Sequence, residues 1–306
     1  MLLPGLCAHA QVAVPGLLPF ADPATLSWEL SSFVSATLLH VEQTATRNEA
    51  SAPDREGSGA GVLVRGRHPG EALALGLYFL DAGLELGSEA GGITRQHLRQ
   101  SALGVSTRIG EEVAVGAGLE QTSEREATSA SDRTLGTLTP MLGISLRLAD
   151  VIYLAMVQGR RRLQSNIPAR DGQERNMSRF GVGLRVLRPG MLVHAEFYRE
   201  DSPPFRDVEF AALPGFSFDV LDTQQNALIA EVIWWGFLLG GSVTNTETIG
   251  TPLKNETVHT QLVSVGFVPP RKLSVTFTWR IEDTDDRIKK TVERLQVLAL
   301  GFYWRF

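Results

Sequence analysis

VLALGFYWRF, residues 297–306, is the stretch that decides the fold. Read with a period of two, it places successive side chains on opposite faces, as a β-strand does. One face carries only large apolar side chains, those of Leu298, Leu300, Phe302, Trp304 and Phe306. The other face is mixed and consists of Val297, Ala299, Gly301, Tyr303 and Arg305. An apolar face toward lipid, a smaller or more polar face toward a lumen, and aromatic residues at the membrane boundary are what the closing strand of a transmembrane β-barrel requires.

The bulk composition is compatible with such a barrel and excludes several other classes. The 306 residues include 34 acidic and 29 basic side chains, a net charge of -5, which gives no indication of a nucleic-acid partner. No run approaches the roughly 20 consecutive apolar residues that a transmembrane helix needs. The single cysteine, Cys7, excludes a disulfide scaffold. Residues 1–10 end in the small-x-small pattern Ala8-His9-Ala10 and are predicted to be a truncated signal peptide.

Strand-like segments follow one another through residues 29–306, each about ten residues long with period-2 alternation. We count about 14 of them, and short turns alternate with long polar loops. The predicted polar loops include residues 46–58, 121–133, 164–176 and 247–256. An even strand number with loops that alternate in length is typical of bacterial outer-membrane barrels. A soluble sandwich or propeller would also alternate, but the apolar face of about 14 strands is too large to bury in one core of this length. The sequence therefore predicts an all-β protein, an antiparallel up-and-down transmembrane barrel.

Two short motifs resemble known elements of such barrels. The pattern formed by Gly301, Trp304 and Phe306 resembles the carboxy-terminal signal that the barrel-assembly machinery recognises. The stretch FADPATL, residues 20–26, resembles the Asn-Pro-Ala-x-Leu element of the long-chain fatty-acid transporter family (FadL-like barrels), with Asp in place of Asn. That resemblance implies a 14-stranded barrel whose amino-terminal segment, here residues 11–28, lies in the lumen as a small hatch. It implies gate residues Asp22, Pro23 and Ala24. The alternative interpretation of Asp22-Pro23 is a simple turn into the first strand.

Face assignment also predicts which charged side chains point into the lumen. The candidates for lining it or holding a ligand are Arg108, Arg147, Arg179, Arg185, Glu196, Glu231 and Arg280, with Glu120 among the further inward charges. These side chains could form cross-strand ion pairs that rigidify the wall, or the arginines could hold the carboxylate of an amphipathic ligand. The run Arg160-Arg161-Arg162 is assigned to the outer end of a strand, facing lipopolysaccharide phosphates or solvent, with a role in ligand entry as the alternative.

The sequence offers little support for an enzyme. None of the six histidines has metal-ligand spacing to another, and no serine lies in a Gly-x-Ser-x-Gly elbow. His259, near the outer end of its strand, is the one candidate for an outer-rim catalytic site, and no partner for it is evident. We expect no cofactor and no metal.

The resulting hypothesis is a channel for passive uptake of hydrophobic or amphipathic, fatty-acid-like molecules through a partly plugged lumen. The alternatives are a general diffusion porin and a structural scaffold barrel. The expected location is the bacterial outer membrane, with both termini periplasmic. Expected partners are outer-membrane lipid and lipopolysaccharide, the barrel-assembly machinery and a hydrophobic ligand, but no nucleic acid. Because the last strand must pair with the first, the gate is expected beside the inner face of residues 297–303.

Overall fold

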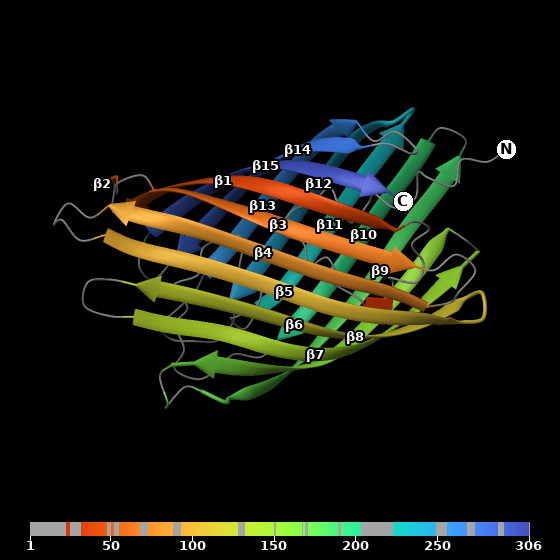
Figure 1. Ribbon diagram of the computed structural model, residues 1–306, viewed down its shortest axis with the longest axis horizontal. Coiled ribbons are helices and arrows are strands. Elements are labelled where there is room, and N and C mark those ends of the chain that lie inside the picture. Colours follow the sequence, from red (N-terminus) through yellow and green to blue (C-terminus); the bar gives the residue numbers. More distant parts are fainter. Residues whose placement is uncertain are drawn as a thin grey trace.

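The computed structural model describes residues 23–24, 32–47, 50–51, 55–67, 73–87, 93–127, 132–149, 151–166, 168, 171–188, 191–202, 223–248, 256–267, 273–286 and 291–305. Within them the chain forms one antiparallel sheet of long strands in sequence order (Figure 1). The first half consists of β1 (Phe33–Arg47), the two-residue β2 (Ala50–Ser51), β3 (Arg55–Arg67), β4 (Leu73–Gly87), β5 (Ile93–Ile109), β6 (Val113–Ala127), β7 (Asp132–Leu148) and β8 (Ile152–Ser165). The second half consists of β9 (Glu174–Arg188), β10 (Met191–Ser202), β11 (Thr223–Trp234), β12 (Phe237–Thr248), β13 (Glu256–Phe267), β14 (Ser274–Asp286) and β15 (Thr291–Arg305).

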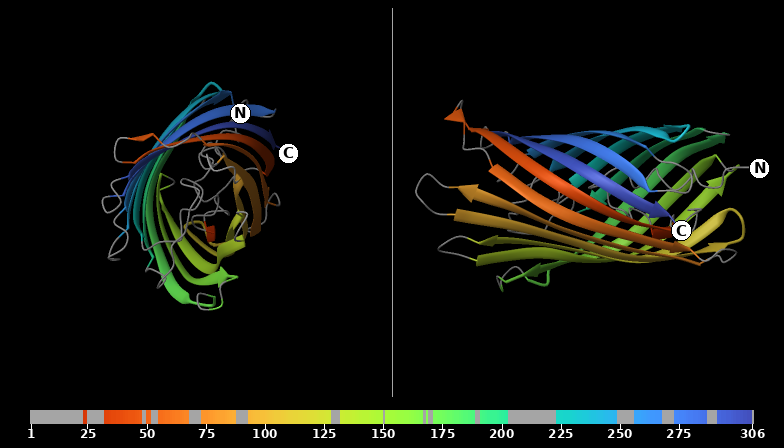
Figure 2. Two further views of the ribbon diagram at one scale, coloured as in Figure 1. Left: turned by 90° about the vertical axis from the view of Figure 1, so that its left-hand side faces the viewer. Right: turned by 45° about the horizontal axis from the view of Figure 1, so that its top comes forward.

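The sheet closes on itself through the stretch that decided the fold. β15 pairs with β14 on one side and with β1 on the other, from Phe33 opposite Arg305 to Arg47 opposite Thr291. Viewed along the strands, the sheet forms an elongated ring (Figure 2). Within the described residues, closure gives each long strand a partner on both sides, which is the condition for a sheet to lie in lipid. The predicted all-β barrel and the pairing of the last strand with the first are confirmed.

The exterior carries an apolar belt. On β15, Trp304 is 60 % exposed, whereas Val297, Ala299 and Tyr303 on the inner face are at most 5 % exposed. Other strands also expose large apolar side chains on their outward face. The outward positions of β4 are Leu73, Leu75, Leu77 and Phe79, and those of β14 are Val275, Phe277 and Trp279. A continuous apolar exterior of this extent is suited to lipid and would not be stable in water. Among the described residues, no helix is long and apolar enough to cross a membrane.

A band of exposed ion pairs lies beyond the belt, at the strand ends away from the short turns. These pairs link neighbouring strands: Arg99 with Asp81, Arg125 with Asp132, Arg160 with Glu174, and Arg294 with Asp283. His97 also contacts Asp81, at 2.6 Å. The strands therefore continue past the apolar belt.

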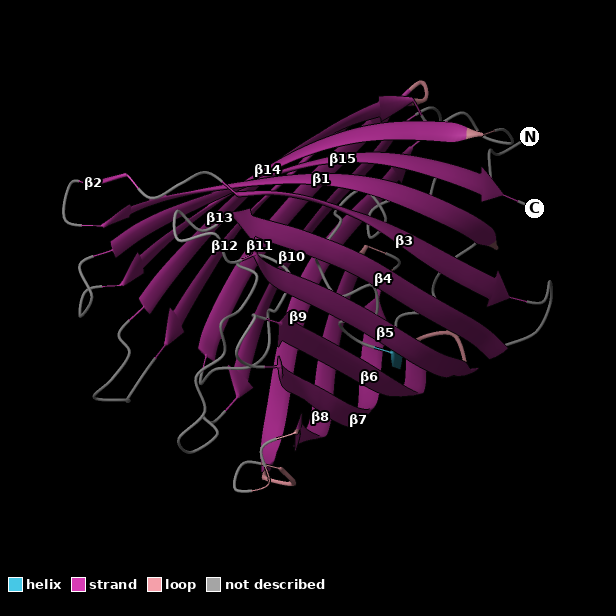
Figure 3. Ribbon diagram, turned by 60° about the vertical axis from the view of Figure 1, so that its left-hand side comes forward, coloured by secondary structure: helices cyan, strands magenta, loops and turns pink. Residues whose placement is uncertain are grey.

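The strands extend into several segments that were predicted to be loops, so the predicted loop boundaries are corrected. The segment predicted as loop 121–133 is strand to Ala127 and again from Asp132, and the segment predicted as loop 164–176 is strand again from Glu174. Likewise β3 already begins at Arg55, inside the predicted loop 46–58. The prediction was wrong here because loss of apolar alternation marks the end of the belt, not the end of hydrogen bonding. Figure 3 shows these long strands tilted across the barrel.

Candidate functional site

Within the described residues, the interior of the barrel contains a docked piece of the amino-terminal segment and a cluster of buried charges. Pro23 and Ala24 form a short 3₁₀ turn, and both are buried. This turn lies inside the ring, and Figure 3 draws it as the one helical piece. It packs against the inner face of β5 and β6.

The surface of β5 and β6 that contacts the turn is built from small side chains. Ser106 Oγ donates a hydrogen bond of 2.8 Å to the carbonyl oxygen of Ala24. Ala24 and Ala114, both fully buried, form one apolar cluster. At Gly116, an added Cβ would lie only 2.5 Å from Ala24 N and 2.5 Å from Pro23 C. The backbone of the turn therefore approaches the backbone of β6 more closely than any residue with a side chain would allow.

Gly118, the next inward residue of β6, extends this contact surface by one position. A Cβ there would lie 3.4 Å from Pro23 Cβ and 3.1 Å from Met141 Cγ on β7. The alternation of β5 and β6 thus presents a smooth, small-residue inner face: Ala102, Gly104 and Ser106, and Ala114, Gly116 and Gly118. This surface accepts a chain segment at van der Waals distance.

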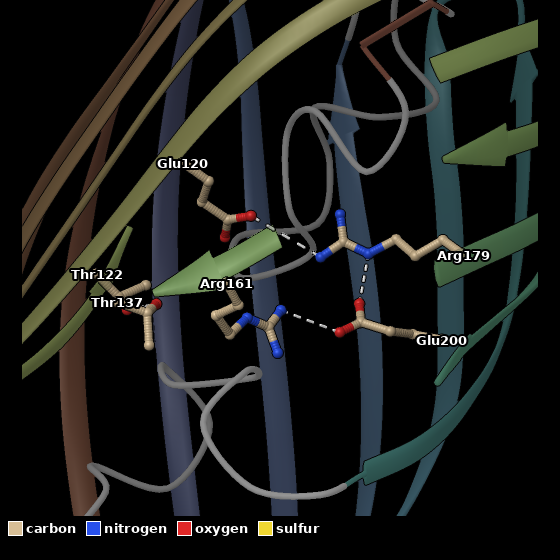
Figure 4. A network of polar contacts seen from close by, with 6 residues as sticks. All are labelled: Glu120, Thr122, Thr137, Arg161, Arg179 and Glu200. Atoms are coloured by element: carbon tan, nitrogen blue, oxygen red, sulfur yellow. Dashed lines mark hydrogen bonds and ion pairs between the residues drawn. The ribbon is translucent and has the colours of Figure 1, made fainter. Parts of the chain in front are cut away.

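The next inward residue of β6, Glu120, belongs to the buried ionic cluster of Glu120, Arg161, Arg179 and Glu200 (Figure 4). Arg161 Nη2 donates to Glu200 Oε1 at 3.1 Å, and Arg179 Nε donates to Glu200 Oε2. Arg179 Nη2 lies 3.8 Å from Glu120 Oε2. All four residues are at most 5 % exposed.

The geometry of this cluster explains why it tolerates burial. Glu200 accepts from two guanidinium groups, so two positive and two negative charges balance in one place. The four side chains come from β6, β8, β9 and β10, and the Glu120–Arg179 contact joins strands that are not neighbours in the sheet. The contact therefore crosses the interior rather than following the wall. Removal of one partner would leave an uncompensated buried charge, which is far more costly than the pair itself.

The opposite wall is lined by hydroxyl groups. Ser264 on β13 and Thr278 on β14 share a hydrogen bond of 2.9 Å, and Thr276 Oγ1 donates to Tyr303 Oη at 3.1 Å. Arg280 continues the inward face of β14 and is 3 % exposed. The interior is therefore polar on β13–β14, whereas the neighbouring inward positions of β15 are Val297, Ala299, Gly301 and the hydroxyl-bearing Tyr303.

The predicted lumen residues are distributed over both walls. Arg108 and Arg147 are half-buried on the inward positions of β5 and β7, and Arg179 and Arg280 are buried. Of these, the structure brings only Arg179 into the ionic cluster, where it lies beside Glu120. Because β6 and β9 are not neighbours in the sheet, this contact differs from the predicted cross-strand pairs along the wall. Arg185, Glu196 and Glu231 lie in β9, β10 and β11, with Arg185 and Glu231 both opposite His194; their side chains lie outside the described part of the structure.

Sequence reasoning missed two members of the cluster. Arg161 was assigned with Arg160 and Arg162 to the exterior, but only its two neighbours are exposed. Glu200 is not among the predicted inward charges, although it lies near the end of β10 on an inward position. For Arg161 the signal was present, because the inward alternation Ala155, Val157, Gly159 continues to this residue.

The expected position of the gate was also wrong. Pro23 and Ala24 contact β5 and β6 rather than the inner face of residues 297–303. The described turn does lie inside the barrel; Asp22 lies outside the described residues. Of the predicted assembly signal, Gly301 is buried and Trp304 points outward, whereas Phe306 lies outside the described residues.

The structure does not strengthen an enzymatic interpretation. His259 is exposed on an outward position of β13. Within the described residues, no group of three or more His, Cys, Asp or Glu side chains is arranged to hold a metal ion.

Comparison with known proteins gives similarity in structure but none in sequence. No protein-family model matches the chain, and no curated protein matches it. Among solved structures, a FadL homologue of Pseudomonas aeruginosa matches 98 % of this chain and 96 % of its own, with a TM-score of 0.59 and 9 % identity. The CymD monoaromatic hydrocarbon channel matches 99 % and 97 %, with a TM-score of 0.56 and 13 % identity. The Ralstonia pickettii toluene transporter TbuX matches 94 % and 92 %, with a TM-score of 0.55 and 13 % identity. The chain therefore has the fold of FadL-like barrels; of these three neighbours, CymD is named as a channel and TbuX as a transporter.

Proposed function

We propose that this protein is a passive outer-membrane channel for hydrophobic or amphipathic small molecules, whose lumen is partly closed by the segment of residues 11–28. The observation that carries the proposal is the docking of Pro23 and Ala24 on the small-residue face of β5 and β6. A water-filled porin has no need to hold its amino-terminal segment against the wall at backbone contact. The names of the structural neighbours, hydrocarbon channels and a toluene transporter, support the same substrate class.

The proposed mechanism needs no energy source. A solute enters at the ends of the strands that carry the exposed ion pairs and descends past the buried ionic cluster. It then passes the docked turn when that segment shifts. In this orientation the short turns, the amino terminus and the carboxy terminus are periplasmic, and residues 301–306 are the element that the assembly machinery recognises.

Arg108, Arg147, Arg185, Glu196, Glu231 and Arg280 remain candidate lumen residues for this path. Arg179 is a poorer ligand-binding candidate, because its guanidinium group already contacts Glu200 and Glu120. A fatty-acid carboxylate would have to compete with these two contacts. The chemistry of the cluster therefore favours uncharged solutes over anionic ones.

The proposal is tested by comparing uptake of two kinds of solute. Gram-negative cells that express the protein, and cells with the empty vector, are given radiolabelled toluene or oleate. The purified protein is assayed for arabinose entry by liposome swelling. We expect faster hydrophobe uptake and little swelling. Rapid swelling with large, steady conductance would instead identify a porin, and no transport of either kind would favour a scaffold barrel.

The plug is tested separately in planar bilayers. Deletion of residues 11–26, or simultaneous replacement of Asp22, Pro23 and Ala24, is expected to raise single-channel conductance. Unchanged conductance would show that this segment does not obstruct the lumen.

A further inference from the structure

The three consecutive arginines at the far end of β8 are divided between the two sides of the wall. Arg161 points inward into the ionic cluster, whereas Arg160 and Arg162 point outward and are exposed. Below them, the outward residues Ile152 and Met156 are 42 % and 49 % exposed and belong to the apolar belt. The two outward arginines therefore lie where the apolar exterior ends, the level of lipid headgroups.

The charge around these two arginines is not balanced. Glu174 on β9 pairs with Arg160, and in the strand register it stands opposite Arg162. Within the described part of the chain, Arg162 makes no ion pair of its own. The exposed residues beside them on the two strands, Gln158 and Asn176, are uncharged, and the next exposed acid along the chain, Asp171, accepts a hydrogen bond from Ser165 N. Two guanidinium groups thus share one carboxylate, which leaves a local charge of about +1.

The other arginines of the outer band differ in this respect. Arg125 donates to both carboxylate oxygens of Asp132, and Arg294 does the same with Asp283. These pairs are neutral and satisfy the planar fork of the guanidinium group. The surplus of positive charge therefore distinguishes the β8–β9 patch from these two described pairs; the patch is defined here as Gln158, Arg160, Arg162, Glu174 and Asn176.

We propose that the β8–β9 patch binds a phosphate group of the outer-leaflet glycolipid, the lipid A portion of lipopolysaccharide. Arginine matches phosphate geometry with two parallel N–H donors, and its aliphatic stem can lie along apolar surface while the charged head stays at the headgroup level. The amides of Gln158 and Asn176 supply further donors. This inference rests on the outer-membrane location proposed above but not on transport.

The test titrates the purified, folded protein in detergent with bisphosphoryl lipid A and measures retention by native mass spectrometry. We expect the double variant R160Q/R162Q to bind about 30-fold more weakly, from the typical contribution of each basic side chain at an anionic membrane surface. The matched control is R125Q/R294Q, which removes the same number of outward charges from the same band, and it should bind lipid A like the wild type. E174Q removes the competing carboxylate and should bind more tightly, an effect that a loss of folding cannot produce.

Three outcomes would overturn the proposal. The first is equal weakening in both double variants, which would indicate attraction to the overall charge of the band. The second is undiminished binding of lipid A from which both phosphates have been removed. The third is complete displacement of lipid A by millimolar inorganic phosphate, which would indicate a site for the free ion. Wild-type hydrophobe uptake in R160Q/R162Q is expected in every case, so failure here is distinguishable from failure of the proposed channel.

Discussion

Adding a side chain at Gly116 is the sharpest test of the docked segment. A Cβ at this position would lie 2.5 Å from two backbone atoms of the Pro23–Ala24 turn, and backbone cannot rotate away as a flexible side chain can. Gly116 lies in the middle of β6, with paired strands on both sides. Gly116→Val should therefore displace the turn and leave the barrel wall intact.

The magnitude follows from the cost of overpacking. Inserting atoms into a well-packed site typically costs about 1–3 kcal/mol. If that cost falls on the docked state alone, the ratio of undocked to docked segment rises about 5- to 150-fold, since each 1.4 kcal/mol is tenfold. Ser106→Ala removes the hydrogen bond to Ala24 O, worth about 0.5–1.5 kcal/mol, and should shift the same ratio more weakly.

The assay is single-channel recording in planar bilayers, with folding checked by heat-modifiable migration in electrophoresis. Gly66→Ala is the matched control, because a Cβ at Gly66 would meet no atom within 4 Å. We expect open probability or conductance to rise in the order Gly66→Ala, Ser106→Ala, Gly116→Val.

A folded Gly116→Val protein whose conductance equals that of Gly66→Ala would refute the reasoning. The turn would then not obstruct conduction, and any closure of the lumen would come from another part of the protein. If the Gly116→Val protein does not fold, the smaller substitution Gly116→Ala is used, because it places the same Cβ in the same contact.

Three further predictions concern stability and assembly. Glu200→Gln leaves Arg161 and Arg179 facing a weaker, neutral acceptor, and it should destabilise the barrel by about 3–5 kcal/mol in urea unfolding from lipid vesicles. Asp132→Asn, at an exposed pair, should change this stability little. An equal loss of stability in both variants would argue against a buried cluster. Leu300→Arg places a charge in the apolar belt and should cost about 2–4 kcal/mol in the same assay, a loss that would be missing if this face were not in lipid. Trp304→Ala combined with Phe306→Ala should reduce the fraction of folded barrel in cells, measured by heat-modifiable migration; normal assembly would show that the carboxy-terminal motif is not the recognised signal.

The strand ends show where sequence reasoning was limited. Apolar alternation predicted the belt segments well, because lipid contact fixes which face must be apolar. It missed the outer extensions of β6 and β7, where Arg125 and Asp132 pair on hydrogen-bonded strands. There both faces are polar, so period and composition no longer separate strand from loop.

The barrel, its closing strand and the two faces of that strand follow from the order of residues, because a side-chain period of two must place every second residue in lipid. The contacts inside the barrel, in contrast, come from the folded arrangement of the strands. This arrangement placed Pro23–Ala24 on β5 and β6, more than 80 positions along the chain, and joined Glu120, Arg161, Arg179 and Glu200 into one cluster. It also divided three adjacent arginines between the lumen and the exterior. These contacts depend on strand register and on the curvature of the ring, and neither is encoded in the alternation of a single strand.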